Sequence, residues 1–348
     1  MRIVVLLGGT SSERDVSIAS GLRIAAALRQ KGHDVVAIDT VRGALTESEE
    51  AALIAGGVMR PLPPDPHALA RLNRDSLPAA VRGLTRDVDV VFLGLHGGQG
   101  EDGTIQALLD LTGVRYTGSG HLASALAMDK DLSKRLFRDS GIPTPDWELL
   151  RDSRAPEWRS PAFAARVEAT FGLPVIVKPS KEGSTVGLSL VKSRDALAAA
   201  VAEAFRHDDE VMIERFIAGR ELTVGILGDD ALPVGEIIPT HELYDYECKY
   251  TPGMAREEFP AKLTAQQAGR IQALALRAFA VLKLSGYARI DFRMTGDGEF
   301  YCLEANTLPG MTELSLIPQA AAAAGIAFPD LCDRIARLAV HAPAPGET

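Results

Sequence analysis

The stretch YARIDFRMTGDGEFYCLEANT (287–307) has the pattern of a β-hairpin and decides much of the fold. Apolar and polar residues alternate on both sides of a Gly-Asp-Gly turn, and the central Asp-Gly predicts a tight two-residue loop. A symmetric loop there pairs Asp291 with Glu304, and Arg289 with Asn306. Because residues two apart on a strand share a face, all of these side chains are expected on one face, with opposed Cβ atoms about 4.5–5.5 Å apart.

This hairpin face favours a magnesium ion. Two carboxylates at that separation repel each other unless one is protonated or a cation lies between them. The oxygens of Asp291, Glu304 and Asn306 suit Mg²⁺, which usually keeps phosphate oxygens and waters as its other ligands. The alternative is a solvated face on which Arg289 neutralises the two acids.

A divalent ion held by so few protein ligands implies a phosphate-binding loop elsewhere in the chain. In LPVIVKPSKEGSTVG (173–187), Lys178 ends a β-run, and a Gly/Ser-rich loop over 180–187 turns back into a second strand. Backbone N–H groups of such a loop can bind phosphate oxygens while the lysine adds a positive charge. No helix follows Lys178, so this is not a Walker motif, and a simple turn between strands is the alternative.

A polar turn also follows the first predicted strand. GGTSSERDVS (8–17) carries a capping box from Ser12 to Asp15, which predicts a helix start where anionic substrate groups bind. Glu13 at this place suits a substrate ammonium group. Its alternative role is a favourable interaction with the helix dipole.

Two further segments carry chemistry. LHGGQGEDG (95–103) places His96 at the end of a predicted strand among glycines, where a structural histidine is the default. THELYDYECKYTPG (240–253) is a long polar and aromatic connection, and long loops of this kind are often lids. In it, Lys249 offers a cation for phosphate and Tyr250 a phenol for hydrogen bonding; a packed surface loop is the alternative.

The remaining pattern predicts a parallel α/β domain followed by an α+β region. The first forty residues follow the strand–turn–helix–strand order of a βαβ unit. Another buried strand over 88–95 and one amphipathic helix over 122–140 follow, and a long helix is predicted over 265–284. Residues 42–86, which are rich in proline and weak in periodicity, are expected to form a variable insertion.

Composition excludes several classes of protein. With 348 residues, 46% of them hydrophobic, the chain has room for two or three domains. A net charge of -9 argues against nucleic-acid binding, and no apolar run approaches the roughly 20 residues that a membrane helix needs. Three scattered cysteines argue against disulfides and zinc, and the N-terminus lacks a signal-peptide pattern. We therefore expect a cytoplasmic protein that binds neither nucleic acid nor membrane.

Taken together, the motifs resemble the D-alanine–D-alanine ligase family of the ATP-grasp superfamily. The matching stretches run in family order across nearly the whole chain: GGTSSERDVS, LHGGQGEDG, YTGSG with ALAMDK, LPVIVKPSKEGSTVG, EVMIERFIAGRELTV, YDYECKY, ARIDF and LEANTLPGMTELSL. The resemblance implies an N-terminal substrate-binding α/β domain (1–118), then a two-domain ATP-grasp fold with a central domain (119–213) and a catalytic C-terminal domain (214–341), and a tail (342–348). It also implies a homodimer.

The reaction implied by the resemblance has two steps. ATP phosphorylates the carboxylate of a first D-alanine, and the amine of a second attacks this acyl phosphate to give the dipeptide for peptidoglycan synthesis. The implied cofactors are ATP and two Mg²⁺, with Mn²⁺ as a substitute. Tyr250 favours an amine nucleophile, because relatives that form the D-alanyl–D-lactate ester tend to carry phenylalanine there. Such a depsipeptide ligase, or another ATP-grasp amino-acid ligase, is the alternative.

The resemblance also assigns roles to single residues. For the nucleotide, they are Lys130, Lys178 and Lys249 at the phosphates, Glu214 at adenine with the backbone of Arg215 to Ile217, and Glu221 at the ribose. For the metal, they are Asp291, Glu304 and Asn306. For the substrates, they are Glu13 and His96 at the first amino acid, Arg289 and the Gly310 N–H at the oxyanion, Ser315 and Leu316 at the second carboxylate, and Ser184 and Tyr250 in a network that joins the lid to Glu13.

Two other classes fit parts of the sequence. A nicotinamide-dependent oxidoreductase would explain the βαβ unit and Asp39 at the end of its second strand, but the G-x-G-x-x-G fingerprint is missing. A non-catalytic ATP-binding module would explain the grasp motifs, yet it needs no amino-acid pocket. Cys248 and Cys302 lie within functional segments but match no family ligand, so neither is expected to be a nucleophile.

Overall fold

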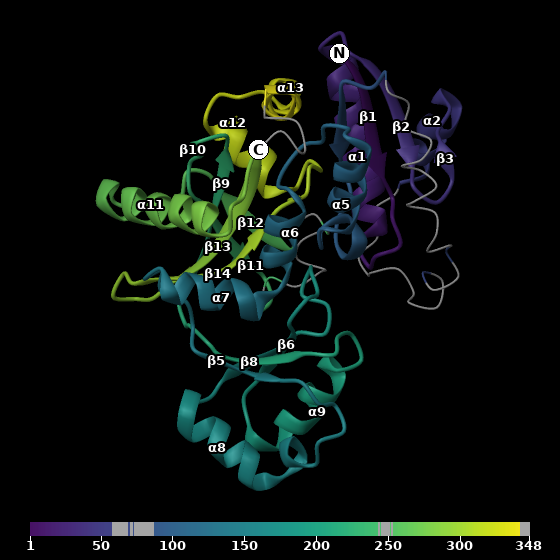
Figure 1. The fold of residues 1–348 in the computed structure, drawn as a ribbon. Coiled ribbons are helices and arrows are strands. Elements are labelled where there is room, and N and C mark those ends of the chain that lie inside the picture. The colour runs from purple at the N-terminus through teal and green to yellow at the C-terminus, as the bar shows by residue number, and fades with distance from the viewer. Residues whose placement is uncertain are drawn as a thin grey trace.

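The structure, a computed structural model, describes residues 1–57, 69, 72, 87–242, 244, 251 and 253–341. These residues form three sheets, each covered by helices (Figure 1). Among the helices of this part of the chain, none is long and apolar enough to cross a membrane.

The N-terminal sheet has the order β3-β2-β1-β4, and β1 pairs in parallel with both β2 and β4. Its strands are β1 (Arg2–Leu7), β2 (Asp34–Asp39), β3 (Gly43–Ala44) and β4 (Val90–Leu93). Its helical segments are α1 (Arg14–Gln30), α2 (Glu47–Gly56), η1 (Gly98–Gly100) and α5 (Thr104–Thr112). The predicted βαβ unit is therefore confirmed. Asp39 is fully buried and accepts hydrogen bonds from both terminal nitrogens of Arg14, at 3.1 and 2.6 Å, so it is not placed to bind a ribose.

The central sheet is antiparallel and has the order β5-β8-β6-β7. Its strands are β5 (Trp147–Leu150), β6 (Val175–Pro179), β7 (Ser189–Val191) and β8 (Val211–Arg215). The helical segments η2 (Glu157–Arg159), α8 (Pro161–Phe171) and α9 (Arg194–Ala204) pack against it. In Figure 1 this sheet and its helices form the lower part of the molecule.

The third sheet has the order β12-β11-β9-β13-β14, with β10 paired to β9. Its strands are β9 (Arg220–Leu227), β10 (Asp230–Ala231), β11 (Gly235–Pro239), β12 (Ala255–Glu258), β13 (Tyr287–Met294) and β14 (Phe300–Asn306). The helices α6 (His121–Met128), α7 (Lys130–Asp139), α11 (Ala265–Val281), α12 (Leu316–Ala323) and α13 (Phe328–His341) complete the described chain.

The single helix predicted over 122–140 is wrong, because the segment forms two helices with a break at Asp129. The backbone of Asp129 is extended, and its side chain accepts a hydrogen bond from Leu132 N at 3.0 Å. Aspartate at this position satisfies an otherwise unpaired N–H at the start of α7. The break places Lys130 in the first turn of α7, where its N–H donates to Ser180 O.

The hairpin that decides the fold has the predicted pairs at its functional end, Arg289 opposite Asn306 and Asp291 opposite Glu304. The predicted two-residue loop is wrong, since residues 295–299 connect the strands. A register shift next to Asp291 leaves Leu303 as an extra residue and compensates for the longer loop. The longer loop and the bulge at Leu303 therefore offset each other, so the predicted pairs form even though the predicted loop does not.

The hydrophobic cores do not follow the order of the chain. Helix α13, at the C-terminal end of the described chain, packs against α1, and Leu331 and Ile335 belong to the core of the N-terminal sheet. Helices α6 and α7 contact β14 and contribute Ala127 and Phe137 to the core of the third sheet. The division of the chain at 118 and 213 remains a prediction.

Candidate active site

Two adjoining cavities lie where loops of the three sheets meet. We call them the Glu13 cavity and the Glu214 cavity; they contain about 820 and 970 Å³ of empty space respectively, open mouths included. Both volumes are in the range of small-molecule sites. The residues that line both cavities are Lys130, Gly183, Ser184, Tyr244, Arg289, Glu304 and Leu316.

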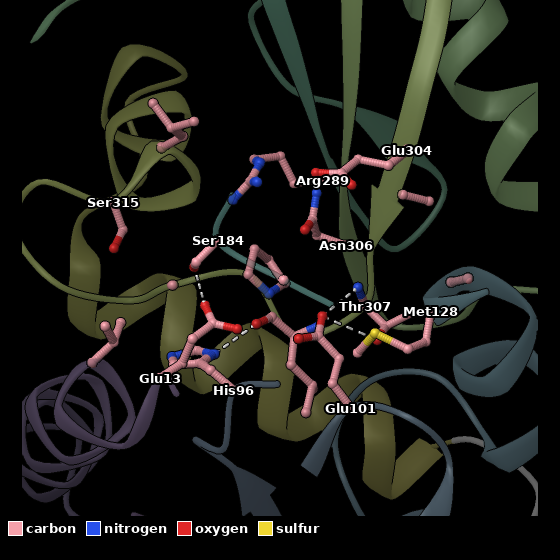
Figure 2. A pocket seen from close by; sticks show the side chains of 18 of the residues that line it. Glu13, His96, Glu101, Met128, Ser184, Arg289, Glu304, Asn306, Thr307 and Ser315 are labelled. Atoms are coloured by element: carbon pink, nitrogen blue, oxygen red, sulfur yellow. Dashed lines mark hydrogen bonds between the residues drawn. The ribbon is translucent and has the colours of Figure 1, made fainter. Parts of the chain in front are cut away.

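The Glu13 cavity brings together the N-terminal strand ends and the β6–β7 loop (Figure 2). Glu13 is the N-cap residue of α1 and is only 8% exposed. The predicted capping box is wrong: no side chain caps this helix, and the Ser11 hydroxyl instead accepts from Glu13 N at 3.2 Å. Ser184 Oγ donates to a carboxylate oxygen of Glu13, which joins two sheets across the cavity.

The β6–β7 loop holds Ser184 in an unusual backbone conformation. Ser184 has φ 48° and Thr185 has φ 62°, so two consecutive non-glycine residues are left-handed. Such residues cost free energy and cluster at functional sites. Lys130 Nζ donates to the carbonyl of Glu182 in the same loop at 2.7 Å, which ties the loop to α7.

The backbone of residues 307–311 forms one wall of the Glu13 cavity. Glu101 Oε1 accepts from the N–H groups of Thr307 and Leu308, at 3.1 and 3.0 Å. Met311 N donates to the Ser20 hydroxyl at 3.1 Å, and Pro309 has no N–H. Within the described residues, the Gly310 N–H is therefore the one N–H of this segment that has no hydrogen-bond partner.

His96 lines this cavity but already uses both ring nitrogens in protein contacts. Nδ1 lies 2.8 Å from Leu308 O, and Nε2 lies 3.0 Å from Ser20 Oγ. Burial lowers the pKa of His96, which favours the neutral ring. A neutral ring donates from Nδ1 to the carbonyl and accepts at Nε2 from the hydroxyl.

The Glu214 cavity is built around a buried carboxylate. Glu214 accepts from Lys134 Nζ at 2.6 Å and from Lys178 Nζ at 2.9 Å. Burial alone would raise the pKa of Glu214, but the two lysines hold it below its usual value. Burial also lowers the pKa of Lys134 to about 8.

The other nucleotide residues predicted within the described chain also line the Glu214 cavity. They are Lys130, Arg215, Ile217 and Glu221. Glu221 forms an ion pair with Arg293 at 3.0 Å, and Arg215 forms one with Asp146 at 3.2 Å. The cavity therefore offers apolar walls with a few placed charges, as a nucleotide requires.

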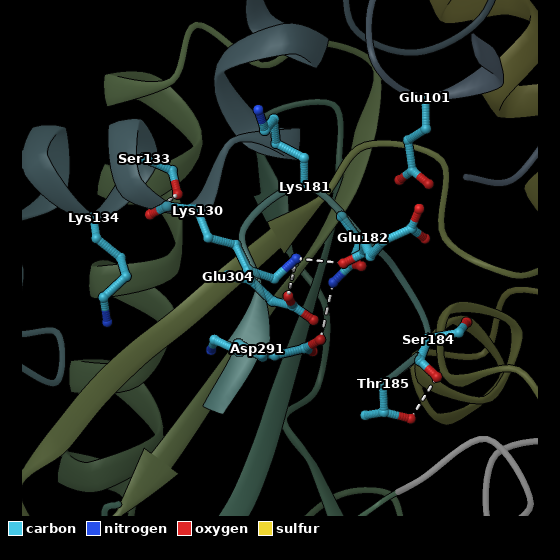
Figure 3. A network of polar contacts seen from close by, with 12 residues as sticks. Glu101, Lys130, Ser133, Lys134, Lys181, Glu182, Ser184, Thr185, Asp291 and Glu304 are labelled. Atoms are coloured by element: carbon cyan, nitrogen blue, oxygen red, sulfur yellow. Dashed lines mark hydrogen bonds and ion pairs between the residues drawn. The ribbon is translucent and has the colours of Figure 1, made fainter. Parts of the chain in front are cut away.

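The predicted metal ligands lie at the boundary between the cavities. Asp291 lines the Glu214 cavity, Asn306 lines the Glu13 cavity, and Glu304 lines both. Asp291 accepts from Arg289 Nη2 at 2.8 Å and from Asn306 Nδ2 at 2.9 Å, while Glu304 lies 3.2 Å from Lys130 Nζ (Figure 3). Two carboxylates and an amide that open toward a cationic cavity are a donor set that fits Mg²⁺.

The second-substrate residues also lie at the Glu13 cavity. Ser315 Oγ accepts from Thr312 N at 3.0 Å and lies 2.8 Å from Thr312 Oγ1, so the hydroxyl is held in place. Gly310 is close by, and Leu316 begins α12. Lys249, Tyr250 and Cys248 lie outside the described residues. Cys302 is fully buried, and burial raises the pKa of its thiol, which argues against a nucleophilic role.

Two family models match the chain. Residues 2–119 match the model described as D-ala D-ala ligase N-terminus, and residues 136–337 match the one described as D-ala D-ala ligase C-terminus. The chain belongs to the D-alanine–D-alanine ligase family. The predicted family is thus confirmed, and so is the prediction that the chain is an enzyme.

Individual members of the ligase family support this assignment along the whole chain. The D-alanine–D-alanine ligase of Geotalea uraniireducens is 43% identical over 335 residues, which cover 96% of this chain and 94% of that protein. That of Aquifex aeolicus is 40% identical and covers 95% of this chain and 98% of its own.

Solved structures of the ligase family agree. The Bacillus anthracis ligase has a TM-score of 0.75 and 35% identity, with 98% of this chain and 97% of that chain covered. The same ligase complexed with ATP gives a TM-score of 0.73 and 33% identity, with the same coverage. The predicted fold class, α/β followed by an ATP-grasp fold, is confirmed.

Sequence reasoning missed several residues of this site. Lys134 could have been found, since it lies four residues after Lys130 and a lysine on the apolar face of a helix is unusual. For Glu101, the one feature of the local sequence that indicated a functional role was the glycine-rich turn around it. Nothing in the local sequence marks Ser20, because its partners lie far away in the chain.

Proposed function

We propose that this protein joins two D-alanines into D-alanyl-D-alanine, with ATP converted to ADP and phosphate through a D-alanyl phosphate intermediate. One observation carries the proposal: a cavity suited to a nucleotide and a cavity suited to an amino acid share a wall of charged residues. A phosphoryl group that crosses this wall would pass from ATP to a carboxylate. The product would serve peptidoglycan synthesis.

ATP would bind in the Glu214 cavity. Glu214 and the backbone from Arg215 to Ile217 would contact adenine, and Glu221 would contact the ribose. Lys130 and Lys178 would neutralise the phosphates. Support comes from the position of these residues around one cavity and from the ATP complex of the Bacillus anthracis relative.

Mg²⁺ would be held by Asp291, Glu304 and Asn306, and two ions are proposed. When bound, the ions would neutralise charge on the transferring phosphoryl group and orient it. In this proposal, the carboxylates and the amide supply oxygen ligands, while Arg289 and Lys130 balance their charge.

The first D-alanine would bind in the Glu13 cavity. Glu13 would hold its ammonium group, and Ser184, together with Tyr250, would orient Glu13. Arg289 and the Gly310 N–H would donate to the oxyanion that forms when the second amine attacks, because donors placed in advance stabilise developing charge. The unpaired Gly310 N–H supports this role.

The second D-alanine would bind with its carboxylate at Ser315 and Leu316. Lys249 would meet the γ-phosphoryl group. We also propose a homodimer in the cytoplasm, as the family resemblance implies. A D-alanine–D-lactate ligase is not favoured, because the relatives matched along the whole chain carry the dipeptide-ligase name.

The test is an ADP-release and phosphate-release assay with Mg²⁺ over a panel of D- and L-amino acids and D-lactate. We expect release that depends on D-alanine, with a dipeptide as product. Release that proceeds equally well without D-alanine, or only with another amino acid, would make the proposal wrong.

The metal assignment is tested by Glu304→Gln, which removes one anionic ligand. We expect kcat to fall on the order of 10²-fold, because several kcal/mol of charge stabilisation depend on the metal. The Mg²⁺-dependent part of nucleotide affinity, measured by calorimetry, should be lost as well.

The matched control for this metal variant is Glu299→Gln, at the loop end of the same hairpin. Glu299 is exposed and pairs with Arg270 at 2.5 Å, so its change should leave turnover and Mg²⁺ dependence intact. Near-normal turnover of the Glu304 variant would contradict the metal assignment.

A further inference from the structure

We propose that Ser20 is a positioning residue, which holds the 308–311 segment so that the Gly310 N–H faces the Glu13 cavity. The inference rests on the proposed function, because it deepens the role given to Gly310. Ser20 lies on α1, which packs against the N-terminal sheet, whereas the segment follows β14 of the third sheet. The contact therefore joins two parts of the molecule across the site.

The Ser20 hydroxyl forms a hydrogen bond on each side. It accepts from Met311 N at 3.1 Å, the residue directly after Gly310. With a neutral His96, it donates to Nε2 at 3.0 Å, and His96 Nδ1–H in turn donates to Leu308 O at 2.8 Å. One hydroxyl and one imidazole thus fix the backbone on both sides of Pro309 and Gly310.

Other contacts stabilise the same segment. Arg23 lies on α1 one helical turn after Ser20, and it donates to Met311 O at 2.9 Å. Its guanidinium lies over the ring of Phe328, 3.6 Å from the ring centre. Glu101 holds the preceding peptides, as described above, and also accepts from Gly97 N at 3.2 Å. The orientation of the free N–H is therefore set from outside its own loop.

A backbone N–H that stabilises an oxyanion must be aimed at a defined point, and an error near 1 Å can cost about 10²-fold in rate. Ser20 is fully buried and lines neither cavity, so it can act only through its two partners, the 308–311 segment and His96. Its loss should therefore lower kcat without changing nucleotide binding.

Ser17 offers a matched control, because it is a fully buried serine one turn earlier on α1. Its hydroxyl also bridges two backbone groups, accepting from Gly8 N at 2.8 Å and donating to Gly94 O at 2.6 Å. Both partners directly follow strands of the N-terminal sheet, Gly8 after β1 and Gly94 after β4. Ser17→Ala should thus reproduce the structural cost of losing a buried hydroxyl but not the effect on the 308–311 segment.

The experiment compares Ser20→Ala with Ser17→Ala and the unchanged protein. For Ser20→Ala we expect kcat with D-alanine to fall about tenfold, with the KM for ATP unchanged. For Ser17→Ala we expect kcat within about twofold of the unchanged protein at a similar loss in thermal midpoint. A Ser20 variant with normal kcat, or equal losses in both variants, would overturn the inference.

Amide hydrogen exchange gives a readout that does not depend on activity. Exchange at Met311 should accelerate about tenfold or more in Ser20→Ala and stay unchanged in Ser17→Ala; unchanged exchange in both variants would overturn the inference. An unchanged protein that lacks D-alanine-dependent turnover would refute the proposed function alone. Should Ser20→Ala not fold, Ser20→Cys replaces it, and a normal kcat with unchanged exchange at Met311 in that variant would overturn the inference as well.

Discussion

Gly310 owes its identity to the space beside it rather than to a special backbone angle. A Cβ atom at this position would lie 2.6 Å from Ser315 Oγ, far inside contact distance. Ser315 cannot turn away freely, because Thr312 holds its hydroxyl. Gly310, the proposed oxyanion donor, must therefore lack a side chain so that Ser315, proposed to bind the second carboxylate, can keep its position.

Gly310→Ala should therefore damage function more than stability. We expect kcat to fall on the order of 10²-fold because the segment must shift by a fraction of an ångström to 1 Å. Gly296→Ala is the control, since a Cβ at Gly296 meets nothing within 4 Å. Steady-state kinetics and thermal unfolding check both variants, and a fully active Gly310 variant would contradict the packing argument.

Glu101 is a second residue whose surroundings change its chemistry. Burial, with Glu13 nearby, raises the pKa of Glu101 to about 7 from 4.5, although the N–H groups of Leu308 and Gly97 and the charge of Arg289 act in the opposite direction. The folded state therefore binds this proton more tightly than the unfolded chain. The resulting stabilisation is fully present below pH 4.5 and is lost as the pH rises through 7.

Comparison with Glu101→Gln tests this pH dependence. The free energy of unfolding of the unchanged protein, minus that of the variant, should fall between pH 4.5 and 7, with a limiting slope of about 1.4 kcal/mol per pH unit. Denaturant unfolding at several pH values measures the difference. A difference that is constant or rises over this range would show that Glu101 is ionised throughout.

At the scale of elements, the break between α6 and α7 connects local sequence to the site. A continuous helix would satisfy the same apolar pattern, but Asp129 stops α6 and caps α7. Lys130 then begins a helix and reaches both the β6–β7 loop and Glu304. A capping residue thus decides where Lys130, the lysine proposed to bind phosphate, points.

Asp129→Ala should remove the cap and loosen Lys130. We expect about 1 kcal/mol of lost stability and a severalfold higher KM for ATP. Thr264→Ala, which removes the cap of α11, should cost a similar amount of stability without changing that KM. Equal effects of both variants on the KM would contradict the link between the cap and the site.

At the scale of the whole molecule, the last described helix packs into the core of the N-terminal sheet. Leu331 on α13 is fully buried in the core of the N-terminal sheet, whereas Arg334 on the same helix is exposed. In the sequence, the strands of the third sheet lie between the N-terminal sheet and α13. The N-terminal sheet and the C-terminal helix are therefore expected to unfold together.

Leu331→Ala should cost about 2–5 kcal/mol, as deletions from a close-packed core do. Hydrogen exchange should show reduced protection in α1 as well as in α13, because α1 loses its partner helix. Arg334→Ala should change neither quantity. Unchanged protection of α1 in the Leu331 variant would mean that α13 does not stabilise the N-terminal sheet and its helices.

The sequence by itself determined the residues that share a strand face and the family. Period-two alternation predicted that Arg289 and Asp291 share one strand face and that Glu304 and Asn306 share one, because side-chain direction on a strand follows from local geometry. The ordered motifs predicted the ATP-grasp fold and the two-substrate reaction. Such features depend on neighbours in the chain or on whole-chain similarity.

Only the tertiary structure decided which groups are already partnered and which remain available. Ser20, His96 and Glu101 become one hydrogen-bonded frame only when α1 and the β4–α5 loop meet the 307–311 segment, and no local pattern encodes that meeting. The two-residue loop of the hairpin was wrong for a related reason: a bulge at Leu303 compensates for a longer turn. Long-range packing, not periodicity, leaves the Gly310 N–H unpaired, since hydrogen-bond partners are chosen by proximity in space.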